Sequence, residues 1–94
     1  MVICVNTYQV KHGQLHKLVS ALASSRIEKT LREMKGNVCF HFSVPIEGKD
    51  ILYLTDIWAD DAAFQAHLSS PATQMWSELK EKYVESSQVR KYDL

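Results

Sequence analysis

The order of two hydrophobic periodicities along the chain constrains its fold more than any single motif does. Segments 2–8, 38–44 and 51–58 contain the β-branched and aromatic residues, or the alternation of apolar and polar positions, that are typical of strands. Between the first two segments, apolar residues from Leu15 to Met34 recur at helical spacing. This pattern predicts one amphipathic helix of about 20 residues, with a length of about 30 Å.

The second half of the chain repeats this order of elements. Asp60 can accept hydrogen bonds from the free amides that begin a helix, and Ser70 can do the same one short helix later, with Pro71 at the first helical position. Residues 88–92 can return as a final strand. The predicted order is strand, helix, strand, strand, helix, strand, with the second helical region in two parts. The inner faces of those parts consist of Ala63, Phe64, His67 and Leu68, and of Met75, Trp76, Leu79 and Tyr83.

These elements predict a ferredoxin-like α+β fold. Right-handed crossovers favour a βαββαβ arrangement in which the helices lie on one face of a four-stranded antiparallel sheet. We expect residues 1–94 to form a single domain, and a chain this short buries only roughly 60–65% of its unfolded surface. The other face of the sheet would lie bare. We therefore expect a second copy of the chain to cover it in a homodimer.

Charge and cysteine content argue against several classes of partner. Eleven basic and eleven acidic residues cancel, and no lysine or arginine cluster indicates a nucleic-acid-binding surface. We expect neither a membrane span nor export, because no apolar stretch of about 18 residues and no signal-like segment occurs. Cys4 and Cys39 stand far apart among apolar residues, which favours buried thiols in a reducing compartment, the cytoplasm.

A strand-to-helix unit in the second half of the chain carries a family resemblance. Asp56 and Trp58 lie two residues apart on a predicted strand, and His67 follows nine residues after the tryptophan, just before a Ser-Pro pair. With Gly13 after the first strand and Gly36 before the second, this pattern resembles the antibiotic biosynthesis monooxygenase family of dimeric α/β barrels. The resemblance covers nearly the whole chain.

The resemblance implies a small homodimer whose sheets pack into a barrel, with a ligand pocket between the sheet and the helices of each protomer. Some members of the family oxygenate aromatic or quinol substrates without metal or flavin, others isomerise small ketones, and others degrade haem. The chain departs from common family residues by having Asp56 in place of glutamate and Ala72 in place of histidine. The haem-degrading branch has an asparagine that resembles Asn6, but its haem-ligating histidine falls at Ser77. The resemblance therefore implies no cofactor.

Three polar residues are the candidate catalytic groups. His67 can take or give a proton near neutral pH, because the unperturbed imidazole pKa is roughly 6.5, or it can simply tie its helix to the strand that holds Asp56. Asp56 could orient His67 or serve only as a structural hydrogen-bond partner. Asn6 lies on an otherwise apolar strand face, where its amide could hold a developing oxyanion or bond to the backbone.

Aromatic residues and one further histidine are candidates for substrate contact. Trp58 could wall a pocket for a flat molecule, although packing in the core would also explain it. Phe64 and Trp76 are open to the same two interpretations. His41 is either another substrate contact or an exposed residue on an edge strand.

The leading hypothesis is a cofactor-independent monooxygenase that acts on a small phenolic or quinol substrate. In this hypothesis His67 is the base, and Asn6 and Asp56 are orienting groups. The alternatives are an isomerase of small hydroxyketones that uses the same residues, and a non-catalytic ligand-binding or structural dimer. His12 and His16 have a spacing that can bind metal on a helix, but no carboxylate or cysteine joins them nearby, so no metal is expected.

Overall fold

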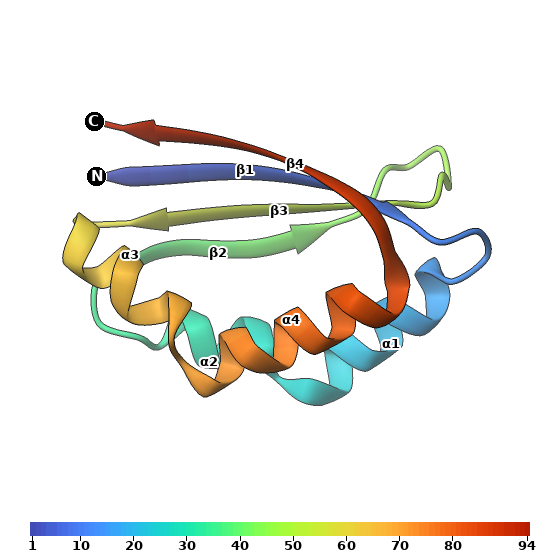
Figure 1. Ribbon diagram of the computed structural model, residues 1–94, viewed down its shortest axis with the longest axis horizontal. Helices are drawn as coiled ribbons and strands as arrows, with labels where there is room; N and C mark the ends of the chain where they lie inside the picture. The colour runs from blue at the N-terminus through green and yellow to red at the C-terminus, as the bar shows by residue number, and fades with distance from the viewer.

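The computed structural model describes all 94 residues and arranges them in two layers (Figure 1). The sheet is four-stranded and antiparallel, with the strand order β2-β3-β1-β4, and the helices cover one of its faces. The ferredoxin-like α+β fold predicted from the sequence is therefore confirmed. The elements are β1 (Val2–Val10), α1 (Leu15–Ser25), α2 (Ile27–Arg32), β2 (Asn37–Ser43), β3 (Ile51–Trp58), α3 (Asp61–Leu68), α4 (Pro71–Tyr83) and β4 (Val84–Asp93).

The two central strands, β1 and β3, carry much of the core on alternate residues. Their antiparallel register pairs Cys4 with Asp56 and Asn6 with Leu54. Asn6 and Asp56 are thus diagonal neighbours on the helix-facing side, within reach of each other's side chains. The buried residues of these two strands are Val2, Cys4, Asn6, Tyr8 and Val10 on β1, and Leu52, Leu54, Asp56 and Trp58 on β3.

The prediction of one long helix after β1 is wrong. The chain breaks at Arg26, whose φ of 60° is left-handed, and a second short helix begins at the next residue. The sequence carries a signal of this break, because the apolar step from Leu22 to Ile27 is five residues rather than three or four. The bend allows both Leu22 and Ile27 to be buried.

No helix of the structure has the length and apolar character needed to cross a membrane.

The predicted side-chain caps of α3 and α4 are present. The Asp60 carboxylate accepts a hydrogen bond of 2.8 Å from the Ala63 amide. The Ser70 hydroxyl accepts one of 3.2 Å from the Thr73 amide, and Pro71 is the first residue of α4. Both helices therefore begin where the sequence predicts.

Two strands differ from the prediction. β4 begins at Val84, directly after α4, rather than at residue 88, because it pairs with β1 along its whole length. On β2, Val38 does not share the buried face with Phe40, because the pairing register shifts between Asn37 and Cys39. Val38 is consequently 56% exposed.

The sheet face that points away from the helices is uncovered and partly apolar. The register aligns Ile3 with Ile57 in one row and Val5 with Thr55 in the next. Tyr92 on β4 lies opposite Ile3 and is exposed, as is Val5. We call this surface the open sheet face, and it is the surface on which a second copy is expected.

Gly36 is predicted to be the glycine least tolerant of substitution. Its φ is +84°, and a Cβ added there would lie 2.5 Å from the Ala63 Cβ at the start of α3. Gly36→Ala is expected to lower the free energy of unfolding by about 2–4 kcal/mol, because left-handed strain and overpacking add.

Gly13→Ala is the matched control, since Gly13 has a φ of +72° and nothing within 4 Å of its added Cβ. In this variant only the left-handed strain acts, so its free energy of unfolding should fall by about 1–2 kcal/mol. Urea unfolding of both variants measures the difference. Equal losses would show that the close approach of Gly36 to α3 contributes nothing.

Candidate functional site

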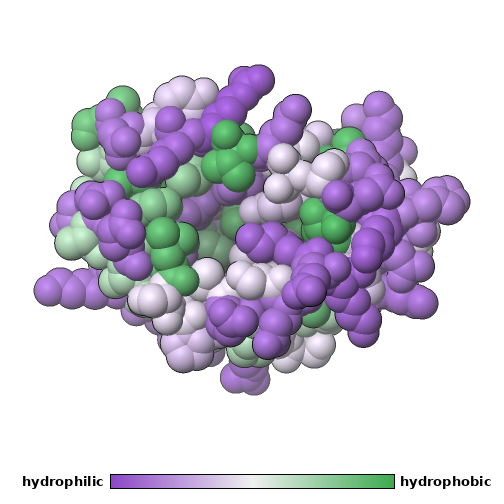
Figure 2. Space-filling view, in the orientation of Figure 1, coloured by the Kyte–Doolittle hydropathy of each residue, from purple (hydrophilic) through white to green (hydrophobic).

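One cavity between the sheet and helices α3 and α4 gathers most of the candidate residues. Its volume is about 210 Å³. Figure 2 shows a hollow near the centre of this side of the molecule, bordered by both hydrophobic and hydrophilic side chains. We call this cavity the His67 pocket. Its wall consists of Cys4, Asn6, Tyr8, Phe40, Leu54, Asp56, Phe64, His67, Leu68, Thr73, Trp76, Lys80 and Val89.

His67 is held in one orientation by contacts on both sides of its ring. Its Nδ1 bonds the Phe64 carbonyl, and because a carbonyl only accepts, Nδ1 carries the proton. The ring stacks on Trp58 with centroids 4.4 Å apart and planes 16° from parallel. In the neutral form Nε2 is therefore the basic nitrogen, and it lies 3.9 Å from Asp56 Oδ2. That separation is too long for a hydrogen bond.

Asp56 is buried, and each of its carboxylate oxygens has a donor. Asn6 Nδ2 donates to Oδ1 at 2.9 Å, and Trp58 Nε1 donates to Oδ2 at 3.0 Å. Asn6 Nδ2 also donates to the Leu54 carbonyl at 2.9 Å, so both protons of its amide are engaged within the protein. The structure therefore brings the three candidate catalytic residues, Asn6, Asp56 and His67, into one cluster.

Burial shifts the pKa values of two ionisable groups in this cluster. It raises the pKa of Asp56 above the ordinary value, against the opposing effects of the Trp58 and Asn6 donors. It lowers the pKa of His67, while the bond to Phe64 and the nearby Asp56 carboxylate oppose the change. Neutral His67 is therefore favoured near neutral pH, and this is the form that can accept a proton.

The aromatic candidates occupy two different places. Phe64 and Trp76 line the His67 pocket, where Trp76 meets the Tyr8 ring edge-on at 5.3 Å. Trp58 has no exposed surface and stands behind His67 rather than in the cavity wall. Its position fits support of His67 and Asp56 rather than direct contact with a ligand.

His41 lies apart from the other candidates. It is exposed on β2, an edge strand, and its register partner Thr55 belongs to the open sheet face. Arg32 Nη2 donates to His41 Nδ1 at 3.2 Å. The structure does not bring His41 into the wall of the His67 pocket.

Comparison with known families and structures identifies the chain's relatives. The sequence pattern of the antibiotic biosynthesis monooxygenase family matches residues 1–79. The chain belongs to this family. A search of curated proteins gave no match.

Several solved structures share the fold of this antibiotic biosynthesis monooxygenase family member. A protein of Shewanella oneidensis is 26% identical, with a TM-score of 0.85 over 97% of this chain and 87% of that chain. A protein of Pseudomonas aeruginosa is 18% identical, with a TM-score of 0.85 over 99% and 93% of the two chains. A structure named as an antibiotic biosynthesis monooxygenase is 13% identical, with a TM-score of 0.82 over 100% and 98%.

Sequence reasoning missed three polar residues of the His67 pocket in this family member, Tyr8, Thr73 and Lys80. Tyr8 is two residues from Asn6 on the same strand face, and burial raises its pKa to about 12. Lys80 follows Trp76 by four residues, which places both on one side of α4. The spacing of Tyr8 from Asn6 and that of Lys80 from Trp76 were the signals in the sequence that could have indicated these two residues. Lys80 is also the first residue beyond the part of the chain that the family pattern matches.

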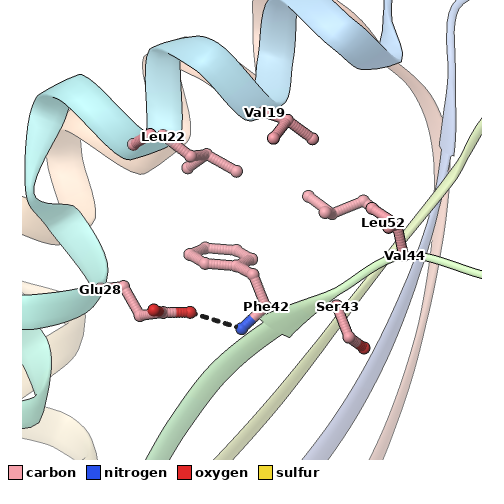
Figure 3. Close-up of a pocket in the computed structure, with 8 residues that line it drawn as sticks. Val19, Leu22, Glu28, Phe42, Ser43, Val44 and Leu52 are labelled. Carbon is pink, nitrogen blue, oxygen red and sulfur yellow. Dashed lines mark hydrogen bonds between the residues drawn. The ribbon is translucent and has the colours of Figure 1, made fainter.

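A second cavity lies between α1 and the end of β2 (Figure 3). It has a volume of about 270 Å³ and a mostly apolar wall that includes Val19 and Phe42. Its single ionisable residue, Glu28, already accepts a hydrogen bond from the Phe42 amide at 2.8 Å and pairs with Arg32 at 3.1 Å. This second cavity therefore has room for a ligand but no free acid or base.

No group of three or more histidine, cysteine or acidic residues that could hold a metal ion occurs in the structure.

Proposed function

We propose that this protein is a cofactor-independent monooxygenase that oxidises a small phenolic or quinol substrate in the His67 pocket. The observation that carries the proposal is the state of His67, whose Nδ1 proton is held by Phe64 while Nε2 has no hydrogen-bond partner. A buried, neutral imidazole in a cavity wall can remove a proton from a substrate hydroxyl. The rings of Phe64 and Trp76 in the same wall suit a flat, aromatic substrate.

A quinol supplies all the electrons that this reaction needs. His67 Nε2 takes a proton from a ring hydroxyl, and the resulting quinolate gives one electron to O₂. The two radicals combine through a new C–O bond at the neighbouring ring carbon, and the peroxide receives the proton from His67. Loss of the proton on that carbon and cleavage of the O–O bond then release water and leave a carbonyl. The balance is quinol plus O₂ giving hydroxyquinone plus water.

Asp56 and Asn6 act as orienting groups in this proposal. Once protonated, His67 lies 3.9 Å from Asp56 Oδ2, and an opposite charge at that distance favours the imidazolium. Asn6 holds the other carboxylate oxygen through its 2.9 Å bond. Because both amide protons of Asn6 are already engaged, its positioning role has more support than an oxyanion-binding role.

Oxygen uptake with a panel of quinols tests the proposal. The protein should accelerate uptake for at least one small quinol, and the His67→Phe variant should not. His67→Phe retains a flat ring against Trp58 and removes both nitrogens, so the comparison isolates the base. Equal uptake by the two proteins, or by neither above the buffer rate, would refute the proposal.

An isomerase of small hydroxyketones is the second candidate. The same observation favours it, because Nε2 of His67 can move a proton between adjacent carbons of a hydroxyketone without any oxidant. Product formation in the strict absence of oxygen distinguishes the two reactions. The non-catalytic alternative, in which His67 only joins α3 to β3, has its support in the stacking of His67 on Trp58.

We also propose that two copies associate through the open sheet face, and that the protein works in the cytoplasm. Both cysteines are free thiols, which fits a reducing compartment. Val5 lies within the open sheet face and is 40% exposed. Val5→Lys is expected to split the dimer, because it would bury an unpaired charge in the contact.

Val19→Lys provides the control for association. Val19 has the same 40% exposure but lies on α1, in the helix layer. Sedimentation should give a dimer for the wild type and for Val19→Lys, and a monomer for Val5→Lys at the same concentration. A monomeric wild type would contradict the proposed association.

A further inference from the structure

Lys80 is a cation in the wall of the His67 pocket with no anionic partner in contact. Its Nζ lies 5.5 Å from the centroid of the Trp76 ring and 5.8 Å from that of the Tyr8 ring. It takes part in none of the ion pairs of the structure. Partial burial lowers the pKa of Lys80, and Asp56 opposes this change from beyond ion-pair distance. The ammonium is thus held by aromatic surfaces and keeps its hydrogen-bonding capacity free.

Two other lysines of the chain have a polar partner, unlike Lys80. Lys11 donates to the Lys82 carbonyl at 2.9 Å, and Lys91 pairs with Asp93 at 4.0 Å. Neither Lys11 nor Lys91 lies in the pocket wall. Lys80 is the single lysine or arginine in the wall itself, and Lys91 Nζ lies 4.8 Å from the centroid of the ring of Phe64, a wall residue.

The carboxylate already in the pocket does not satisfy Lys80. Both oxygens of Asp56 accept hydrogen bonds from Asn6 and Trp58, and Lys80 is not among its partners within 4.0 Å. His67 comes from α3 and Lys80 from the later part of α4, two helices that follow different directions in Figure 1, and both residues line the pocket. A ligand can therefore meet the base with one part and the cation with another.

We propose that Lys80 is a specificity-determining residue that binds an ionised acid group on the substrate. The proposal rests on the function proposed above and narrows the substrate class to quinols that carry a carboxylate. The carboxylate accepts hydrogen bonds from Nζ, the ring lies against Trp76, and a ring hydroxyl faces Nε2 of His67. A charge-assisted hydrogen bond of this kind should raise the affinity for the carboxylated ligand by about 10- to 100-fold.

Binding of two matched probes under nitrogen tests the proposal. The probes are 2,5-dihydroxybenzoate and its uncharged analogue 2,5-dihydroxybenzamide, and calorimetry measures their dissociation constants. The wild type should bind the benzoate about 10- to 100-fold more tightly than the amide. Lys80→Met should lose this preference and still bind the amide, and Lys80→Arg should keep most of the preference.

Lys82→Met is the control on the same helix, because Lys82 lies over Tyr83 and outside the pocket wall. It should bind both probes as the wild type does. Thermal unfolding of all three variants establishes that each is folded. The proposal is overturned if the wild type binds neither probe, if it does not prefer the benzoate, or if Lys80→Met keeps the preference.

The outcome of this binding experiment is independent of whether the protein oxygenates quinols. Tight, Lys80-dependent binding of the benzoate without oxygen uptake on admission of air would support the anion site and contradict the monooxygenase. Oxygen uptake with neutral quinols and no preference for the benzoate would support the monooxygenase and contradict the anion site.

Discussion

The variant His67→Phe is expected to lower kcat/KM for quinol oxygenation by about 10²–10⁴-fold, the usual contribution of a general base. The phenylalanine ring can replace the imidazole against Trp58, so the fold and the affinity for substrate should change little. Steady-state oxygen uptake gives the rate, and thermal unfolding confirms that the variant is folded. A loss that resides entirely in KM would instead indicate that His67 only contacts the substrate.

The pH dependence of the rate gives an independent check on the same residue. Burial lowers the pKa of His67 below its ordinary value of 6.5, so the neutral base is present throughout the neutral range. The rate should therefore be level from neutral pH upward and should fall only as acid protonates the imidazole. Protonation of His67 should also lower stability. The pKa of His67 is lower in the folded chain than in the unfolded chain, so the unfolded chain binds the proton more readily. The contribution of His67 to the free energy of unfolding is therefore lost as the pH falls through and below 6.5. A rate that rises with acid would contradict the role of base.

Trp58→Ala is expected to lower the free energy of unfolding by about 3–5 kcal/mol, the largest loss of any single change considered. Trp58 has no exposed surface, stacks on His67 and donates to Asp56 Oδ2 at 3.0 Å. Trp58→Phe keeps most of the ring and removes the donor, so it should lose only about 1–3 kcal/mol. Chemical unfolding at neutral pH measures both. Equal losses would mean that the packing of the ring contributes little beyond its hydrogen bond.

The order of elements and the helix caps could be predicted because they depend on local sequence. Asp60 and Ser70 act on amides three residues away, and alternation along β1 assigns each residue to one face of the sheet. The break at Arg26 was missed although the five-residue step from Leu22 to Ile27 indicates it. Its cause is tertiary, since the bend follows from burying residues on both sides of it.

The candidate site was predictable where residues share a strand or adjoining elements. Asp56 and Asn6 follow from strand alternation and antiparallel pairing, and His67 follows from the helix after β3. Lys80 was missed because its spacing from Trp76 indicates only its side of α4, and the packing of α4 is needed to bring it to the same cavity as Asn6. His41 was included because alternation alone does not determine whether a residue on an edge strand faces a pocket or solvent.

The most direct test of the central claim is mass spectrometry of the product formed from a quinol under ¹⁸O₂. If His67 activates the substrate for direct reaction with oxygen, the hydroxyquinone should contain one atom of ¹⁸O, and the His67→Phe variant should form little of it. A product without ¹⁸O, or one with the mass of the starting quinol, would contradict the account.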